Sequence, residues 1–165
     1  MPESISQRPP SIADCTNLGW REWLALPSLG IASIKAKLDT GARSSALHVE
    51  ALETFHQDGM LQVRFVVRPR RRALRVIACC APVIDCRPVT DSGGHRSERW
   101  FICTDIMLAG QQFSTEMNLT DRRAMLFPLL LGRSALEGRF RVDPALSYTC
   151  PRPLRSVCPN PEKSE

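Results

Sequence analysis

The chain has 165 residues, which is enough for one hydrophobic core but too few for two lobes with separate cores. Its formal net charge is +5, and arginine supplies most of the positive charge because the only lysines are Lys35, Lys37 and Lys163. Residues 1–10 lack the apolar region of a signal peptide and no apolar stretch reaches the roughly 18 residues of a membrane span, so we expect a soluble, cytoplasmic protein without a membrane partner.

The two ends of the chain differ in composition from its middle. Residues 1–16 are polar and contain prolines, and residues 149–165 form a proline-rich tail. Such segments bury too little apolar surface to offset the entropy of ordering them, so both are expected to be disordered or loosely attached. Residues 17–148 are predicted to form the single folded domain.

Within this domain, apolar residues alternate with polar ones, which is the pattern of half-buried strands. Only Ser134–Gly138 suggests a short helix, near the C-terminus. Many short strands with frequent turns predict an all-β barrel or sandwich, and a closed barrel is favoured because it hides strand edges. The predicted strands are Arg21–Leu26, Ile34–Leu38, Leu61–Val67, Val76–Val83, Trp100–Leu108, Phe113–Leu119 and Leu126–Leu131, with turns at Pro27–Gly30, Asp58-Gly59, Ser92–Gly94 and Ala109-Gly110.

The tripeptide Asp39-Thr40-Gly41 directly follows the predicted strand Ile34–Leu38. Aspartic proteases present their catalytic aspartate on a tight turn at the end of a buried strand, and Gly41 lets the backbone turn sharply. Two ordinary alternatives are an Asx-turn, in which Asp39 caps its own backbone, and a salt bridge. The tripeptide occurs once, so an aspartic protease built on it requires two chains.

A second segment far downstream also has an apolar strand that leads into a turn, because the apolar Leu129–Leu131 runs into Gly132-Arg133. With the tripeptide, it resembles the single-domain retropepsin pattern. Over about residues 18 to 148 the chain is similar to a bacterial retropepsin-like family labelled putative ATP-dependent zinc proteases and associated with ATP-grasp glutamate ligases that modify a ribosomal protein. The matching blocks are Gly19–Trp23, Lys35–His48, Ser92–Arg99, Asn118–Met125, Leu130–Arg133, Phe140–Pro144 and Ser147-Tyr148.

The resemblance implies an acid-protease barrel in which Asp39 is catalytic and Thr40 and Gly41 complete the active-site turn. One departure concerns Arg43, which stands where viral retropepsins have an acidic residue. That acid is the usual partner of the arginine at the position of Arg133, which therefore needs another partner, for which Asp143 is the candidate. The residues expected to support the turn are Ala42, Arg43, Gly132 and Arg133.

A retropepsin site is closed by a flap that excludes water. The resemblance places this flap at Val89–Arg99, with Gly93-Gly94 at the tip of a hairpin. His95 and Glu98 would then lie over the cleft. The alternative for these residues is an exposed polar loop.

The zinc label has little basis in the sequence. His48, His95 and Glu98 are the candidate ligands, but they are widely separated in the chain. The seven cysteines contain no C-x-x-C pair and are expected to be mostly reduced thiols. An H-E-x-x-H helix is missing, and no lysine follows a glycine as in a P-loop, so no cofactor is expected; the alternative is a catalytic zinc site made by the three candidate ligands and a water.

Five arginines fall within Arg68–Arg75. Guanidinium groups pair bidentately with phosphate or carboxylate, so this run could bind nucleic acid or an acidic peptide. The alternative is a solvated hairpin tip.

These observations favour a homodimeric aspartic peptidase with a dyad formed by Asp39 from two chains. Its substrates are expected to be acidic or glutamate-rich peptides, such as a glutamate-modified ribosomal protein. One alternative is a non-catalytic module that binds an ATP-grasp ligase or a ribosomal protein through Arg68–Arg75. A zinc-dependent hydrolase is the other.

Overall fold

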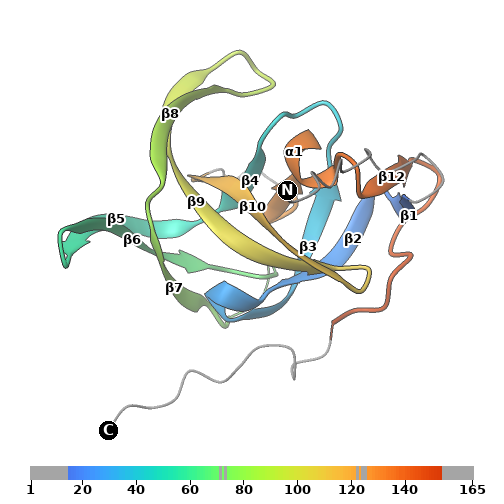
Figure 1. Ribbon diagram of the computed structural model, residues 1–165, viewed down its shortest axis with the longest axis horizontal. Helices are drawn as coiled ribbons and strands as arrows, with labels where there is room; N and C mark the ends of the chain where they lie inside the picture. Colours follow the sequence, from blue (N-terminus) through green and yellow to red (C-terminus); the bar gives the residue numbers. More distant parts are fainter. Residues whose placement is uncertain (1–14, 71, 73, 122, 124–125, 154–165) are drawn as a thin grey trace, which may run out of the picture.

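A computed structural model describes residues 15–70, 72, 74–121, 123 and 126–153 (Figure 1). Strands dominate this part of the chain, and its helical elements are a one-turn α-helix and the short 3-10 helix η2 (Pro27–Leu29), which confirms the all-β prediction. The elements are β1 (Thr16–Gly19), β2 (Arg21–Leu26), β3 (Ile31–Leu38), β4 (Ser45–His48), β5 (Glu50–Gln57), β6 (Met60–Val67), β7 (Ile77–Pro82), β8 (Asp85–Thr90), β9 (Arg96–Leu108), β10 (Gln111–Thr120), β11 (Leu129–Leu131), α1 (Arg133–Leu136) and β12 (Phe140–Asp143).

The main sheet has the strand order β10-β4-β11-β3-β2-β9-β8. It curls back on itself because β9 also pairs with β10, from Gln111↔Leu108 to Asn118↔Phe101. Between β2 and β9 the ring is joined by the one register pair Ala25↔Met107. The sheet is therefore a barrel with one weak seam.

Two smaller sheets complete the fold. Strands β5, β6 and β7 form an antiparallel meander, whose β5–β6 hairpin projects from the barrel in Figure 1. The Asp58-Gly59 turn of this hairpin has positive φ at both residues (52° and 75°), as two-residue hairpin turns require. Strands β1 and β12 pair in parallel and join the two ends of the domain.

The core lies inside the barrel and beneath the meander. Large apolar side chains from most of the strands are fully buried there, and burial of each contributes about 1.5–3 kcal/mol. Among the described residues, no helix is long and apolar enough to cross a membrane. The largest fully buried side chains include Leu24, Leu26, Ile34, Leu47, Phe65, Ile102, Ile106 and Met117.

Parts of the two terminal segments, which the sequence predicts to be loosely attached, are held against the domain. Thr16 already belongs to β1, and the fully buried Glu22 accepts hydrogen bonds from the backbone N–H groups of Gly19 (2.8 Å), Thr149 (3.0 Å) and Cys150 (3.3 Å). Residues 149 and 150 are thereby held against β2. The predictions for residues 1–14 and 154–165 lie outside the described residues.

Candidate active site

Asp39 stands where β3 meets β11. The two strands are parallel, with Leu38 opposite Leu131, and the Asp39 N–H donates to the Leu131 carbonyl at 2.8 Å. This bond belongs to the last pair of the ladder and holds the first residue after β3. Asp39 is fixed by its backbone at the strand end, as the sequence predicts.

The Asp39 side chain is half-buried and forms a local turn. Its Oδ1 accepts a hydrogen bond from the Gly41 N–H at 2.9 Å, and its carbonyl accepts one from the Ala42 N–H at 3.3 Å. The Asx-turn considered from the sequence is thus present, whereas a salt bridge to Asp39 is not found among the described residues. The local hydrogen bond engages one carboxylate oxygen only. Thr40, Gly41 and Arg43 are exposed.

The start of α1 packs against the loop that follows Asp39. Arg133 N–H donates to the Ala42 carbonyl at 2.8 Å, and Ser134 N–H donates to the Arg43 carbonyl at 3.1 Å. A Cβ atom at Gly132 would lie 2.6 Å from the carbonyl carbon of Ser44, so the contact requires glycine. The two segments singled out in the sequence are therefore in direct contact.

The proposed partner of Arg133 is wrong. The Arg133 side chain is exposed and forms no ion pair with Asp143 in the part of the chain that the structure describes. The Asp143 carboxylate instead accepts a hydrogen bond from the Ala145 N–H at 2.9 Å, because it caps the turn that follows β12. Arg133 contacts the loop through its backbone.

The predicted flap is the β8–β9 hairpin, which rises at the same end of the barrel as α1 and the loop joining β3 to β4 (Figure 1). Gly93, Gly94, His95 and Glu98 are all exposed on it, and Gly94 has φ +83°. The turn is organised by Asp91, whose Oδ1 accepts from the N–H groups of Gly93 (2.9 Å) and His95 (3.0 Å). Sequence reasoning did not single out Asp91, although aspartate at the start of a Gly-rich turn is a known turn signal.

A chain of buried polar groups joins the hairpin strand β9 to the loop that follows Asp39. Arg99 Nη1 donates to Asn118 Oδ1 at 3.0 Å, and Asn118 Nδ2 donates to the Ser45 carbonyl at 2.9 Å. Ser45 Oγ accepts from the Gly132 N–H at 3.1 Å. The side chains of Arg99, Ser45 and Asn118 are at most 8% exposed. Their role was missed because it depends on contacts between residues distant in sequence.

The three zinc candidates are not gathered at one place. No group of three or more His, Cys, Asp or Glu side chains suited to a metal occurs within the described ranges. His95 lies beside Asp91, with Nδ1 3.5 Å from Oδ1, on the exposed hairpin turn. His48 is at the end of β4, where its backbone N–H donates to the Pro128 carbonyl at 2.8 Å.

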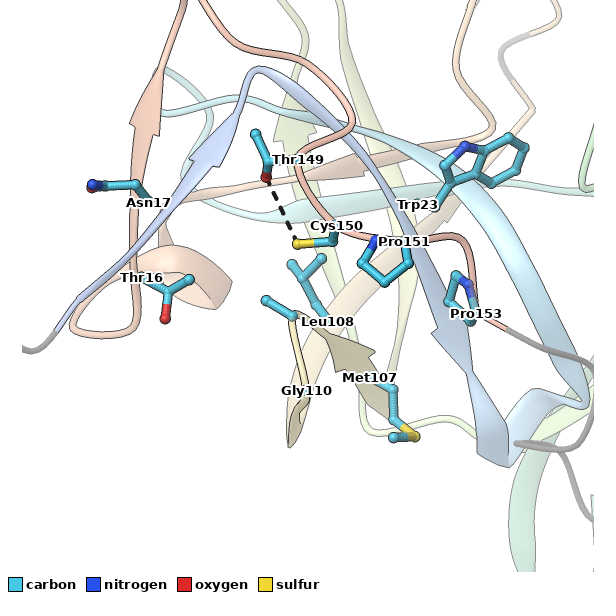
Figure 2. Close-up of a pocket in the computed structure, with 11 residues that line it drawn as sticks. Thr16, Asn17, Trp23, Met107, Leu108, Gly110, Thr149, Cys150, Pro151 and Pro153 are labelled. Carbon is cyan, nitrogen blue, oxygen red and sulfur yellow. Dashed lines mark hydrogen bonds between the residues drawn. The ribbon is translucent and has the colours of Figure 1, made fainter.

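A separate cavity of about 480 Å³ lies on the outside of the barrel, beside the C-terminal segment (Figure 2). Trp23, Met107 and Leu108 line it from the barrel, and Cys150, Pro151 and Pro153 line it from that segment. The Thr149 hydroxyl and the Cys150 thiol are 3.7 Å apart at its edge. Asp39 is not among its lining residues.

Comparison with known families identifies the fold. A family model described as RimB-like, retropepsin-like aspartic endopeptidase RimB, matches residues 17–153. A crystal structure of a protein of unknown function from Legionella pneumophila superposes with a TM-score of 0.69 at 28% identity, over 81% of this chain and 97% of that one. The resemblance stated from the sequence is confirmed.

The curated relatives are named as ligases rather than as peptidases. A probable alpha-L-glutamate ligase of Desulfotalea psychrophila is 42% identical over 130 residues, which cover 78% of this chain and 28% of the ligase. A probable alpha-L-glutamate ligase of Shewanella pealeana is 36% identical over 132 residues, which cover 79% of this chain and 29% of the ligase. This chain therefore spans less than a third of the length of these relatives.

Proposed function

Because this chain belongs to the RimB-like family of retropepsin-like aspartic endopeptidases, we propose that it hydrolyses peptide bonds with a pair of Asp39 carboxylates from two copies. The observation that supports this most directly is the Asp39 turn, which is bonded to Leu131 and packed against Gly132. A half-buried carboxylate held this way is positioned by backbone rather than by a flexible side chain. Two such carboxylates can be presented to one substrate with little reorganisation.

The proposed mechanism follows from the electrostatics of two close carboxylates. Across a two-fold axis they cannot both ionise cheaply, so one keeps a proton. The protonated carboxyl donates a hydrogen bond to the scissile carbonyl, while the ionised one takes a proton from the attacking water. The pair titrates as a unit, and each chain supplies one member. The dimer would be isologous, with the same surface of each copy at the axis.

We further propose that the substrates are acidic, glutamate-rich peptides. The formal net charge of +5 favours anionic partners. The names of the curated relatives point to glutamate as the group that is added, and a peptidase beside such a ligase would act on its product. A glutamate-extended ribosomal protein is the candidate that this reasoning favours.

The test compares wild-type protein with Asp39→Asn and with the control Asp58→Asn. Asp58 is an exposed turn residue with φ 52°, which asparagine tolerates, so the control makes the same chemical change away from the site. Hydrolysis of glutamate-rich peptides is followed by mass spectrometry at mildly acidic pH, and molecular mass by light scattering. We expect a dimer, loss of hydrolysis in Asp39→Asn and full activity in Asp58→Asn. An active Asp39→Asn protein, or an active strict monomer, would contradict the proposal.

A non-catalytic binding module is the second candidate. The relatives support it, because the region similar to this chain makes up under a third of proteins named as ligases. Such a module would bind a ligase or a ribosomal protein through the arginines of residues 68–75. Arg70→Glu with Arg72→Glu would abolish partner binding in this case, whereas a peptidase would still cleave a small neutral peptide.

A further inference from the structure

The outer face of β2 bears an indole surrounded by positive charges. Trp23 has the Arg152 guanidinium 4.5 Å, the Lys35 ammonium 5.2 Å and the Arg70 guanidinium 5.8 Å from a ring centroid. These cations come from β3, from the arginine-rich segment after β6 and from the C-terminal segment. The fold thus gathers around one aromatic ring several charges that lie far apart in the sequence.

The same face continues along β2 towards the active-site end of the barrel. Arg21 lies between two rings, 4.7 Å from Trp20 and 4.9 Å from Tyr148. Directly across the strand pair from Arg21 stands the exposed Lys37. Like charges opposite one another destabilise a strand pair, so packing alone does not explain this arrangement. We call Arg21, Lys35, Lys37, Arg70 and Arg152 the cationic face.

No carboxylate neutralises the cationic face within the described residues, where none of its five members forms an ion pair. Elsewhere on the surface Arg64, Arg68 and Arg87 each pair with a glutamate or an aspartate. The acidic residue of β2, Glu22, points inward and is fully buried by the alternation of the strand. The face therefore carries positive charge that the described part of the chain does not balance.

The cationic face is aligned with Asp39. Side chains at every second residue of a strand lie on one face, which groups Lys35 with Lys37 on the part of β3 that ends next to Asp39. Asp39 directly follows β3, and its N–H donates to the Leu131 carbonyl, so the backbone of β3 leads straight to it. At roughly 3.3 Å per residue, Lys35 is about 13 Å from Asp39, the length of about four residues of an extended peptide.

We propose that the cationic face is a binding site for a carboxylate-rich peptide segment, separate from the residues that flank the scissile bond. It would hold an acidic chain by ion pairs at Lys35, Arg70 and Arg152 while a neighbouring part of that chain lies at Asp39. The identity of this ligand as a substrate tail rests on the proposed peptidase function. The binding itself does not require hydrolysis.

A peptide fits this face better than single-stranded nucleic acid. Nucleic-acid sites of this kind offer free aromatic rings on which bases stack. Here Trp23 and Tyr148 already have cations over their rings, and the two rings lie together at 6.1 Å between centroids. The donors left for a ligand are guanidinium and ammonium groups, which bind carboxylates without stacking.

The experiment measures fluorescence anisotropy of a labelled octaglutamate peptide, with octaglutamine and a single-stranded RNA octamer as comparison ligands. The test variant is Lys35→Gln with Arg152→Gln. The matched control is Arg64→Gln with Arg139→Gln, because Arg64 and Arg139 also lie over aromatic rings, Phe55 and Phe113, at 4.3 and 4.4 Å. Both double variants lose two positive charges, and the test variant loses three cation–π contacts whereas the control loses two.

We expect octaglutamate to bind the wild-type protein, roughly tenfold more weakly to the test variant and within about twofold of wild type to the control. Equal weakening in both variants would show a general charge effect and overturn the proposal, as would tighter binding of the RNA or no binding of octaglutamate. Binding without hydrolysis would contradict the peptidase function and leave this site standing. Hydrolysis with unchanged binding in the test variant would contradict this site alone.

Discussion

Replacing Gly132 with alanine tests whether the contact between α1 and the loop that follows Asp39 positions this aspartate. The new Cβ atom would lie 2.6 Å from the carbonyl carbon and oxygen of Ser44 and 2.9 Å from the carbonyl oxygen of Arg43. All three are backbone atoms, so no side chain can rotate out of the way. The loop between Asp39 and β4 must shift, or the β11–α1 segment must move away from it.

The expected cost can be worked from these contacts. Overpacking a well-packed region costs about 1–3 kcal/mol. The shift also weakens the hydrogen bond from Gly132 N–H to Ser45 Oγ, which contributes about 1 kcal/mol. The free energy of unfolding should therefore fall by about 2–4 kcal/mol. With a urea dependence of about 2 kcal/mol per molar, the unfolding midpoint falls by about 1–2 M.

The assay is urea unfolding followed by tryptophan fluorescence, with peptide hydrolysis measured on the folded variant. Gly93→Ala is the control, because a Cβ at Gly93 would meet only side-chain atoms, His95 Nδ1 at 3.2 Å and Asp91 Oδ1 at 3.3 Å. We expect that control to lose less than about 1 kcal/mol. Equal unfolding midpoints for the two variants would refute the argument that backbone contact at Gly132 supports the loop.

Three further predictions concern buried polar groups. Asn118→Ala removes the link between Arg99 and the Ser45 carbonyl, so the free energy of unfolding should fall by about 1–3 kcal/mol and hydrolysis should slow. The control is Asn17→Ala at an exposed residue, which should change neither the free energy of unfolding nor the rate of hydrolysis. Glu22→Ala leaves the N–H groups of Gly19, Thr149 and Cys150 without their acceptor, so the free energy of unfolding in urea should fall by about 3 kcal/mol. A fall no larger than that caused by Glu98→Ala, at an exposed residue, would contradict this role of Glu22. Burial, with a smaller effect of Cys80, raises the pKa of Cys79 to about 12, so its thiol stays protonated at pH 8. Iodoacetamide should therefore react first with the exposed Cys80, Cys86 and Cys103, as followed by mass spectrometry. Alkylation of Cys79 at the same rate as these three would contradict the prediction.

Strands with a buried and an exposed side were predictable from the sequence. Arg21–Leu26 matches β2 residue for residue, and the alternation of Leu61–Val67 identifies β6 to within one residue. The strand β5 was missed because neither of its sides is buried, so Glu50–Gln57 shows no alternation. Strands β1 and β12 were missed for another reason, since each is only four residues long and pairs across most of the chain.

The candidate site was predictable in part. Asp39 and Gly132-Arg133 were found through their resemblance to a family, and the structure brings these segments into contact. Pairing of Arg133 with Asp143 was wrong because a local backbone donor satisfies Asp143. The cationic face could not be predicted, since periodicity shows which side of a strand is exposed but not which distant segments meet there.

The position of β11 has a consequence for synthesis of the protein. This strand lies between β3 and β4 and supplies the acceptor for the Asp39 N–H, although it follows β3 by roughly 90 residues, a separation that makes such pairing slow to form. A growing chain that carries Asp39 therefore lacks the support of its turn until residues 129–133 have emerged from the ribosome. Any hydrolytic activity would be withheld from nascent chains and appear only when the domain is nearly complete.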